Sequence, residues 1–322
     1  MGLLIKMLTK KMWGKEMNIL VTGGAGFIAS HIVDRLIELG HKVSVVDNIS
    51  TGNRNHINKN ASFYNLSILD ENISEVFGKV KPEVVIHHAA QIDIQTSIKQ
   101  PALDAEINIL GTIRLLNQCK DQGVRKIIYA SSAAVYGTPD YLPVDEKHPV
   151  RPLSFYGISK HTPEHYIEVF SQLTGLDYTI LRYANVYGIR QDPKGEGGVI
   201  SIFIDKLLEG VKPSIYGDGE QTRDFIYVKD VVEANVAALL RGSKKILNVS
   251  CNQQTTVNQL LKLMSQLCNK PFEPNYLPPR DGDILHSCLD NTAALTELNW
   301  TPKYSLQEGL NETCEYYSGI YA

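Results

Sequence analysis

The sequence contains no apolar run approaching the roughly 18 residues that a membrane-spanning helix needs. Its five cysteines include no C-x-x-C pair, so the pattern favours neither a disulfide framework nor a zinc site. A basic excess is also missing, because 32 Lys and Arg residues face 35 Asp and Glu residues, a formal net charge of -3. These absences argue against a membrane protein and a nucleic-acid-binding protein. We expect a cytoplasmic protein with reduced thiols and no bound metal.

Residues 1–16 form a separate lysine-rich segment with four Lys and one Glu. Its longest uncharged apolar run, residues 3–5, ends at Lys6, and no small-residue cleavage site follows, so a signal peptide is not indicated. Met17 directly precedes a strand-like segment. We therefore interpret residues 1–16 as an N-terminal extension of a globular chain that, at 322 residues, is long enough to bury a large core.

Between residues 17 and 188, short Val- and Ile-rich segments alternate with longer amphipathic stretches. Apolar strands that alternate with helices predict an α/β fold, a Rossmann-like doubly wound parallel sheet covered on both faces. Residues 189–322 have Gly- and Pro-rich connections, and we expect a smaller mixed α/β substrate-binding lobe from which some segments return to the first domain. The predicted strands are NILVTG, KVSVVD, ASFYNL, EVVIHHAA, KIIYASS and YTILRY.

The first predicted strand runs into a glycine-rich turn and then into an amphipathic helix. Gly23 and Gly26 allow a tight turn that brings backbone N–H groups to a pyrophosphate at the positive end of the helix. Asp47 ends the second strand, where its carboxylate can accept hydrogen bonds from ribose hydroxyls and would repel a ribose 2′-phosphate. The combination predicts a dinucleotide site, and the carboxylate favours NAD over NADP. The glycines alone would also fit an ordinary β-α turn that binds no cofactor.

Tyr156 and Lys160 stand four residues apart in a helix-like segment, a spacing that puts them on one face. The pKa of a phenol is near 10 and must fall by about three units, which corresponds to roughly 4 kcal/mol, before the phenol can act as a base near neutrality. A positive charge about 4 Å away, such as that of Lys160, stabilises the phenolate by roughly this amount. Ser132, at the end of the fifth predicted strand, is placed to bind a reacting hydroxyl. Taken alone, the Tyr/Lys pair would more commonly be surface residues and the serine a turn residue.

A series of motifs follows one another along the chain. They are residues 22–29, His88-Ala89-Ala90, Asn108, the Tyr156/Lys160 pair, RYANVYG at 182–188, GEGGVI at 195–200, IYGDGEQTRDFIYVKD at 215–230 and RDGD at 280–283. In these motifs the chain resembles the extended short-chain dehydrogenase/reductase family from Met17 to its C-terminus. The second half resembles UDP-glucose 4-epimerases and their UDP-N-acetylhexosamine relatives.

The resemblance implies which residues contact each ligand. The cofactor residues are Gly23, Gly26, Phe27, Ile28, Asp47, Asn48, Ser67, Ile68, Ala89, Ala90, Asn108, Tyr156 and Lys160. The residues implied for a UDP-sugar are Ser132, Tyr156, Asn185, Val199, Ile215, Tyr216, Arg223, Arg280, Asp283 and Ser287.

Within this set, Arg223 and Arg280 are expected at the UDP pyrophosphate, which guanidinium groups suit. Ile215 and Tyr216 are expected to bracket the uracil, although Tyr216 could equally be packed in the core. Two positions depart from the family. Ala29 replaces a third glycine, where we expect one methyl group to be tolerated, and Ser67 replaces an Asp that reaches the adenine.

The resemblance implies 4-epimerisation of UDP-hexoses through a transient 4-keto sugar, with Tyr156 as the proton acceptor and a homodimer formed through helices near residues 104–120 and 154–171. The apolar faces of these helices could instead only cover the sheet. Dehydratases and decarboxylases of the family carry carboxylates where this chain has Ala133 and Ala134, which disfavours both reactions. A UDP-uronate 4-epimerase and a catalytically silent NAD-binding regulator stay open as alternatives.

Ser287 bears on the size of the sugar. It stands seven residues after Arg280, where epimerases restricted to UDP-glucose and UDP-galactose carry a bulky tyrosine. A serine leaves room for a 2-acetamido group, so we expect activity on UDP-N-acetylglucosamine and UDP-N-acetylgalactosamine as well. The alternative is that Ser287 is a polar loop residue outside the pocket.

Overall fold

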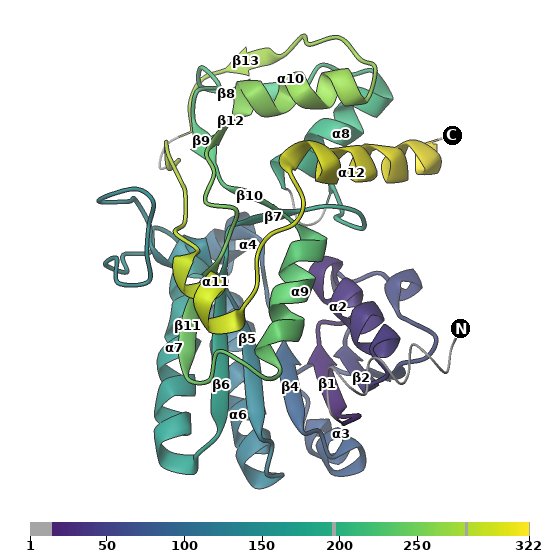
Figure 1. Cartoon of the computed structure of the whole chain (residues 1–322), viewed down its shortest axis with the longest axis vertical. Helices are drawn as coiled ribbons and strands as arrows, with labels where there is room; N and C mark the ends of the chain where they lie inside the picture. The colour runs from purple at the N-terminus through teal and green to yellow at the C-terminus, as the bar shows by residue number, and fades with distance from the viewer. Residues whose placement is uncertain (1–14, 195–197, 281–282, 322) are drawn as a thin grey trace.

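The computed structural model describes residues 15–194, 198–280 and 283–321 (Figure 1). The expected N-terminal extension lies outside this part of the chain except for Lys15 and Glu16, and so do residues 195–197 and 281–282 of two substrate-lobe motifs. None of the helices in the described part combines the length and the apolar composition that a membrane crossing needs.

Seven parallel strands form the main sheet, in the order β11-β6-β5-β4-β1-β2-β3. All six segments predicted as strands before residue 188 are present, which confirms the Rossmann-like fold. The seventh strand, β11, comes from the second half of the chain and pairs with β6 at the edge of the sheet. The strands are β1 (Asn18–Thr22), β2 (Lys42–Asp47), β3 (Ser62–Asn65), β4 (Val84–His87), β5 (Lys126–Ser132), β6 (Asp177–Tyr183) and β11 (Lys245–Val249).

Successive strand residues enter two cores on opposite faces of the sheet. Ile19 and Val21 of β1 belong to one core, and Leu20 belongs to the other. Helices cover both faces, so most positions of the central strands are buried and these strands read as continuous apolar runs. One face is covered by α2 (Phe27–Glu38), α9 (Val228–Ala238) and α11 (Thr292–Leu298), and the other by α3 (Ile73–Val80), α6 (Gly111–Asp121) and α7 (Phe155–Thr174).

Three short helical segments precede α6, and they are α4 (Ile94–Lys99), α5 (Pro101–Ala105) and a π-helical turn (Glu106–Leu110). Two 3-10 turns, Arg54–His56 and Ala133–Val135, follow β2 and β5. The second of these turns directly continues the strand that ends at Ser132, so it lies beside the candidate catalytic serine.

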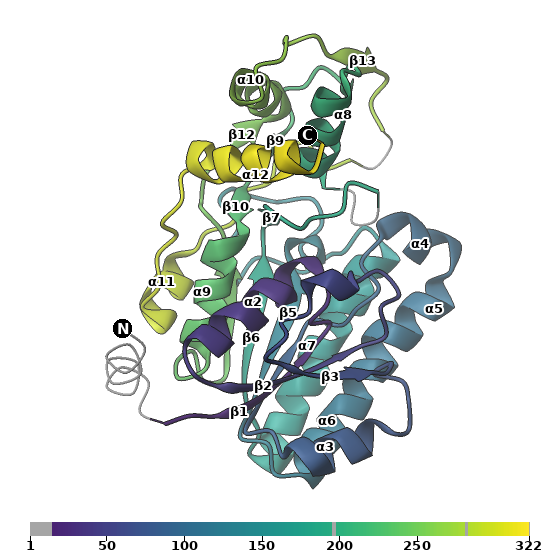
Figure 2. The same cartoon turned by 90° about the vertical axis from the view of Figure 1, so that its right-hand side faces the viewer.

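The second lobe lies beyond the carboxyl ends of the sheet strands (Figures 1 and 2). Its helices surround a third core that contains Phe203, Leu260 and Leu310. Its strands form three two-stranded pairs: β7 (Asn185–Tyr187) with β10 (Phe225–Tyr227), β8 (Ser214–Tyr216) with β13 (Asn275–Leu277), and β9 (Thr222–Arg223) with β12 (Thr255–Thr256). The helices are α8 (Val199–Glu209), α10 (Val257–Leu267) and α12 (Leu306–Tyr321). The exact division of the chain at residue 188 stays a prediction.

Candidate active site

The glycine turn adopts a conformation that requires glycine. Gly23 has φ +72°, and a Cβ atom there would lie 2.7 Å from the backbone N of Ala89. Gly26 precedes α2 and contributes no side-chain cap, and the first turn of the helix carries no acidic residue. The first N–H groups of α2 are therefore available to an anion such as a pyrophosphate. Ala29 packs in the core at 2% exposure, so its methyl group is accommodated as expected.

Asp47 at the end of β2 is oriented by two backbone donors. Its Oδ2 accepts a hydrogen bond from the N of Ala25 at 2.9 Å, and its Oδ1 accepts one from the N of Ile49 at 2.8 Å. Each carboxylate oxygen keeps acceptor capacity, which suits the hydroxyls of a ribose. Asn48 next to it is exposed.

Four further predicted cofactor residues follow the carboxyl ends of β3 and β4. Ile68 is buried, and Ser67 is half-buried and accepts a hydrogen bond from the N of Leu69. The N of Ala89 donates to Thr22 Oγ1 at 3.2 Å, which ties the loop after β4 to the end of β1. Ala90 follows it, half-buried.

Asn108 is only 2% exposed, and its amide is occupied by protein groups. Its Oδ1 accepts from the N of Gln91 at 2.8 Å, and its Nδ2 donates to the O of Gln91 and to Ser159 Oγ, both at 2.9 Å. Its amide joins the loop after β4 to α7 through these bonds. The cofactor contact implied for Asn108 stays a prediction, and the second lone pair of its Oδ1 is the group that could make it.

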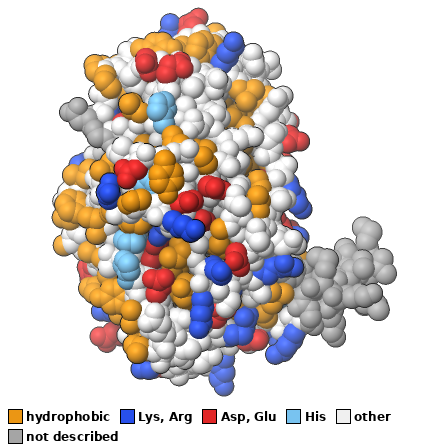
Figure 3. All heavy atoms as spheres, turned by 60° about the vertical axis from the view of Figure 1, so that its left-hand side comes forward, with side chains coloured by type: hydrophobic (Ala, Val, Ile, Leu, Met, Phe, Trp, Pro, Cys, Tyr) orange, Lys and Arg blue, Asp and Glu red, His pale blue; other side chains and the backbone are white. Residues whose placement is uncertain are grey.

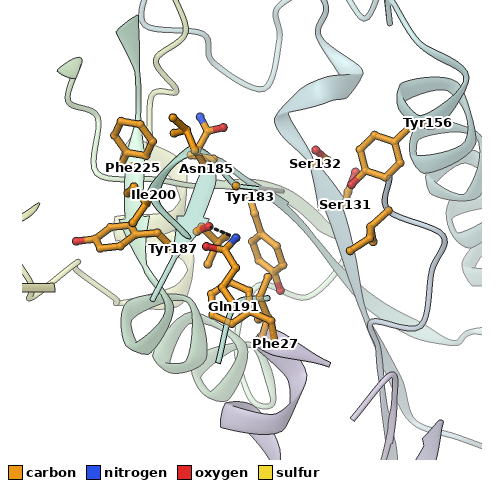
Figure 4. Close-up of a pocket in the computed structure, with 16 residues that line it drawn as sticks. Phe27, Ser131, Ser132, Tyr156, Tyr183, Asn185, Tyr187, Gln191, Ile200 and Phe225 are labelled. Carbon is orange, nitrogen blue, oxygen red and sulfur yellow. Dashed lines mark hydrogen bonds between the residues drawn. The ribbon is translucent and has the colours of Figure 1, made fainter. Parts of the chain in front are cut away.

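The candidate catalytic residues come together from β5 and α7. Ser154 caps α7 by accepting a hydrogen bond from the N of Gly157 at 3.1 Å. A Cβ atom at Gly157 would lie 2.7 Å from the O of Ala134, so glycine allows the start of α7 to approach the end of β5 closely. Figure 4 shows the Tyr156 ring directed from α7 toward Ser132. Both residues line a cavity of about 270 Å³.

Lys160 lies one helical turn after Tyr156 and is 4% exposed. Its ammonium nitrogen is 4.7 Å from the centre of the Tyr129 ring. Burial lowers the pKa of Lys160 to about 8, and the charges of Glu164 and Asp104 oppose this shift. Lys160 is therefore still mainly cationic at neutral pH, and a cation there favours the ionised form of the neighbouring phenol.

Two neighbouring histidines carry no charge near neutrality. Burial, together with the charge of Lys160, lowers the pKa of His88 to about 3 and holds that of His87 well below its ordinary value. His87 lies between Thr22 Oγ1 and Thr112 Oγ1, at 2.8 and 3.0 Å. Both rings therefore act as neutral hydrogen-bonding groups beside Lys160.

A buried charge network that was not predicted from the sequence supports this site. Glu164 accepts hydrogen bonds from Arg182 Nε at 3.0 Å and from Ser131 Oγ at 2.6 Å. Although burial raises the pKa of Glu164, hydrogen bonds from His161, Arg182 and Ser131 hold it at about 2. Two signals were available: Glu164 lies four residues after Lys160, and Arg182 interrupts the apolar strand YTILRY. A charge inside a buried strand requires a partner.

The cavity is lined by both lobes (Figure 4). The predicted residues on its wall are Phe27, Ile28, Ser132, Tyr156, Asn185 and Val199. Tyr183, Gln191 and Phe225 also line the cavity but were not among the predicted site residues. Tyr183 and Phe225 lie in the motifs at 182–188 and 215–230, but only the packing of the second lobe against the sheet shows that they reach the cavity.

The residues predicted for the uracil and for the pyrophosphate arginines lie in the second lobe and are not part of the wall of this cavity. The guanidinium carbon of Arg280 is 3.7 Å from the centre of the half-buried Tyr216 ring. Arg223 donates a hydrogen bond to the O of Thr222 at 2.8 Å. Burial lowers the pKa of Arg223, and the negative charge of Asp283 partly offsets this effect. Ile215 is 1% exposed in the third core, and the uracil contact expected of it stays a prediction.

Ser287 lies beside Arg223 although 64 residues separate them. The N of Ser287 donates to the O of Thr222 at 3.2 Å, and the N of Thr222 donates to the O of Leu285 at 2.8 Å. These two bonds hold the segment after Arg280 against β9. Ser287 is half-buried there, and Asp283 is exposed.

A family model described as the NAD dependent epimerase/dehydratase family matches residues 19–250. The chain belongs to this NAD dependent epimerase/dehydratase family. As in the family, its cofactor is NAD. The uncapped start of α2, the turn at Gly23 and the oriented carboxylate of Asp47 fit this cofactor.

Three members of the epimerase/dehydratase family illustrate what this chain is similar to. It is 48% identical to the crystallised UDP-glucose 4-epimerase of Thermotoga maritima with UDP-glucose, with a TM-score of 0.93 over 95% of this chain and 100% of that one. It is 40% identical to the UDP-glucose 4-epimerase of Mycolicibacterium smegmatis over 94% of this chain and 98% of that protein. The UDP-N-acetylglucosamine 4-epimerase of Methanobrevibacter ruminantium, in complex with UDP-N-acetylmuramic acid, is 36% identical, with a TM-score of 0.91 over 95% and 99% of the two chains.

Proposed function

We propose that this protein is an NAD-dependent 4-epimerase of UDP-hexoses. The observation that carries the proposal is the meeting of Ser132 and Tyr156 at one cavity between the lobes, with Lys160 buried one turn behind. Ala133 and Ala134 supply no carboxylate next to Ser132, so an oxidised sugar has no evident acid or base for elimination or decarboxylation. Reduction back to an alcohol is then its simplest fate.

In this reaction Tyr156 accepts the proton of the sugar 4-hydroxyl, while Ser132 holds that hydroxyl by a hydrogen bond. Lys160 stabilises the phenolate electrostatically. NAD, held by the glycine turn and Asp47, would supply the hydride acceptor for carbon 4 and the hydride donor for the reverse transfer. Because hydride must return to the opposite face of the 4-keto sugar, the hexose has to turn over while the nucleotide stays bound. Contacts with the UDP group must therefore provide most of the binding energy of the substrate.

We assign the UDP group to the second lobe. Arg280 is exposed above Tyr216, and Arg223 lies on the neighbouring strand pair, so two guanidinium groups are offered to the pyrophosphate from separate elements. Asn185 and the start of α8 at Val199 line the cavity between this lobe and Tyr156. A UDP-sugar bound in this way would extend from Arg280 to Tyr156.

We further propose that the protein accepts N-acetylated UDP-hexosamines as well as UDP-glucose and UDP-galactose. The support is the half-buried Ser287, which is held against β9 by its backbone N–H and carries a short side chain. A tyrosine at this position would add a ring beside Arg223. An obstruction of this kind changes selectivity by about 1 to 3 kcal/mol, which is 10- to 200-fold.

The test is an NMR assay of the purified holoprotein on UDP-glucose, UDP-N-acetylglucosamine and UDP-glucuronate. We expect turnover of the first two sugars, and Ser287→Tyr should lower kcat/KM for the acetamido sugar selectively by 10-fold or more. Ser74→Tyr, an exposed serine on α3, is the matched control. An unchanged substrate ratio in Ser287→Tyr contradicts the specificity proposal. Turnover of the uronate alone indicates a UDP-uronate 4-epimerase, and no turnover of any sugar indicates the silent regulator.

We also propose a homodimer formed through α7 and the neighbouring segments α5 and α6. An apolar stripe on α7 is exposed and is defined as Phe155, Ile158, Tyr166, Val169 and Leu173, with spacings of three, eight, three and four residues. Val169 is 50% and Leu173 79% exposed, and Figure 3 shows hydrophobic side chains gathered on this side of the molecule. A two-fold axis would bring two such stripes together and bury both.

Sedimentation analysis tests the dimer. The wild type should sediment with the mass of two chains, and Val169→Lys should sediment as one chain, because a charge in the stripe would be buried without a partner. Leu240→Lys is the control, since Leu240 is 54% exposed at the end of α9, away from the stripe. A monomeric wild type contradicts the proposal.

A further inference from the structure

Two of the five free cysteines lie in contact in the second lobe. Cys268 directly follows α10, Cys314 lies in α12, and their Sγ atoms are 2.9 Å apart. They are 46 residues apart in sequence. A disulfide has an S–S distance of about 2.05 Å, so bond formation needs an approach of less than about 1 Å.

The two thiols differ in access and acidity. Cys268 is partly exposed, and its pKa is lowered by the hydrogen bond with Cys314 and by the charge of Lys270, against the effect of burial. Cys314 is 4% exposed, and its pKa is raised by its hydrogen bond with Cys268 and by burial. Because a thiolate is the nucleophile in disulfide exchange, Cys268 reacts first and Cys314 second.

The other three cysteines are not suited to this reaction. Burial raises the pKa of Cys251 and of Cys288 to about 12, and it raises that of the buried Cys119 as well. Among the described residues, the hydrogen bond between two cysteine sulfurs joins Cys268 and Cys314, whereas Cys288 Sγ donates to Asp224 and Asn252. An oxidant therefore meets one activated thiol with a second thiol directly behind it.

We propose that Cys268 and Cys314 form a reversible dithiol–disulfide site that is oxidised by low-molecular-weight disulfides such as oxidised glutathione. The Cys268 thiolate attacks the S–S bond of the oxidant, forms a mixed disulfide and releases one thiolate. Cys314 then loses its proton and attacks the Cys268 sulfur, which expels the second small thiol. Two protein thiols are oxidised, and one small disulfide is reduced to two thiols.

The cross-link would tie down the last helix of the chain. The hydroxyl of Tyr317 in α12 donates to the O of Gln191, whose side chain lines the active-site cavity. Glu312 of the same helix pairs with Lys229. Oxidation would thus link α12, the helix that contacts the Gln191 loop, covalently to the end of α10. This inference does not depend on which sugar the protein binds.

The experiment treats the NAD-loaded wild type, Cys268→Ser and the control Cys251→Ser with excess oxidised glutathione. The small molecules are removed, free thiols are counted after unfolding in acid, and the linked peptides are identified by mass spectrometry. We expect the wild type to lose two of its five thiols with Cys268 joined to Cys314. Its Tm should rise by about 5 °C or more, because the bond constrains a long loop of the unfolded chain, and dithiothreitol should reverse the rise.

The control Cys251→Ser should lose two thiols and show the same rise in Tm as the wild type. Cys268→Ser should keep all its thiols, and its Tm should not change. Cys268 is partly exposed, so its serine variant replaces a sulfur that is not enclosed in the core. Retention of all five thiols by the wild type overturns the proposal. So does a stable mixed disulfide on Cys268 without a link to Cys314, or an equal response of Cys268→Ser and the wild type.

Discussion

The two lobes hold their functional side chains in different ways. In the first lobe, Lys160 and the ion pair of Glu164 with Arg182 are buried against a continuous seven-stranded sheet. In the second lobe, Arg280 is exposed above Tyr216, and the strands that carry the site are only two or three residues long. Side chains that are buried and hydrogen-bonded are held in one conformation, whereas exposed side chains can change conformation when a ligand binds.

This difference matches the division of labour in the proposed reaction. Proton transfer needs reacting groups held within a fraction of an ångström, and packed elements with hydrogen-bonded side chains provide this. Nucleotide binding must tolerate a sugar that turns over between two steps, so exposed groups on short strands suffice. Substitutions in the first lobe should therefore affect catalysis and stability, and substitutions in the second lobe should affect nucleotide binding.

Replacing Tyr156 by Phe should lower kcat by 100-fold or more and leave UDP affinity nearly unchanged, because the change removes a proton acceptor but no nucleotide contact. Steady-state kinetics and UDP titration measure the two effects. Tyr166→Phe, an exposed tyrosine of the same helix, should retain wild-type rates. Retention of most activity by Tyr156→Phe would overturn its assignment as the proton acceptor.

Replacing Glu164 by Gln should lower the free energy of unfolding by about 3–5 kcal/mol, because it leaves Arg182 as a buried unpaired charge. The folded-state pKa of Glu164, about 2, is below its ordinary value, so this stability is present above pH 4.5 and is lost as the pH falls toward 2. Urea unfolding at several pH values measures it.

Glu168→Gln, a partly exposed glutamate on the same helix, is the control and should change the stability by less than about 1 kcal/mol. Equal stabilities of the two variants would contradict the view that the first lobe depends on its buried network.

Replacing Arg280 by Ala should raise KM for UDP-sugars by about 10-fold with little change in kcat, because a hydrogen bond to a charged group is worth about 1.5–3 kcal/mol. Arg241→Ala removes another exposed guanidinium, far from Tyr216, and should leave KM unchanged. A fall in kcat alone, at constant KM, would place Arg280 in the chemistry rather than in nucleotide binding.

The pH profile of kcat/KM tests Lys160. Burial lowers its pKa to about 8, so its cationic fraction, and with it the stabilisation of the phenolate, declines as the pH rises through 8. We expect activity to fall about fivefold between pH 8 and 9. Lys160→Arg should be slower but should lose this alkaline fall, since arginine stays charged. An unchanged alkaline limb in that variant would assign the titration to another group.

Short-range patterns in the sequence were enough to predict the sheet, the glycine turn at Gly23 and the one-turn spacing of Tyr156 and Lys160. Each of these depends on residues within a few positions of one another, through strand burial, backbone conformation or helical periodicity. Ile215 shows the limit. In a three-residue strand, periodicity does not indicate which side chain faces the core, and only the structure shows that Ile215 is buried there.

The sequence by itself therefore determined which elements form and which residues are chemically suited to the cofactor and to proton transfer. Only the tertiary structure decided which distant groups meet: Glu164 with Arg182, Ser287 with the strand of Arg223, and Cys268 with Cys314. These contacts arise where elements far apart in the chain pack together. No local propensity or spacing encodes them, because they depend on the path of the backbone between the elements.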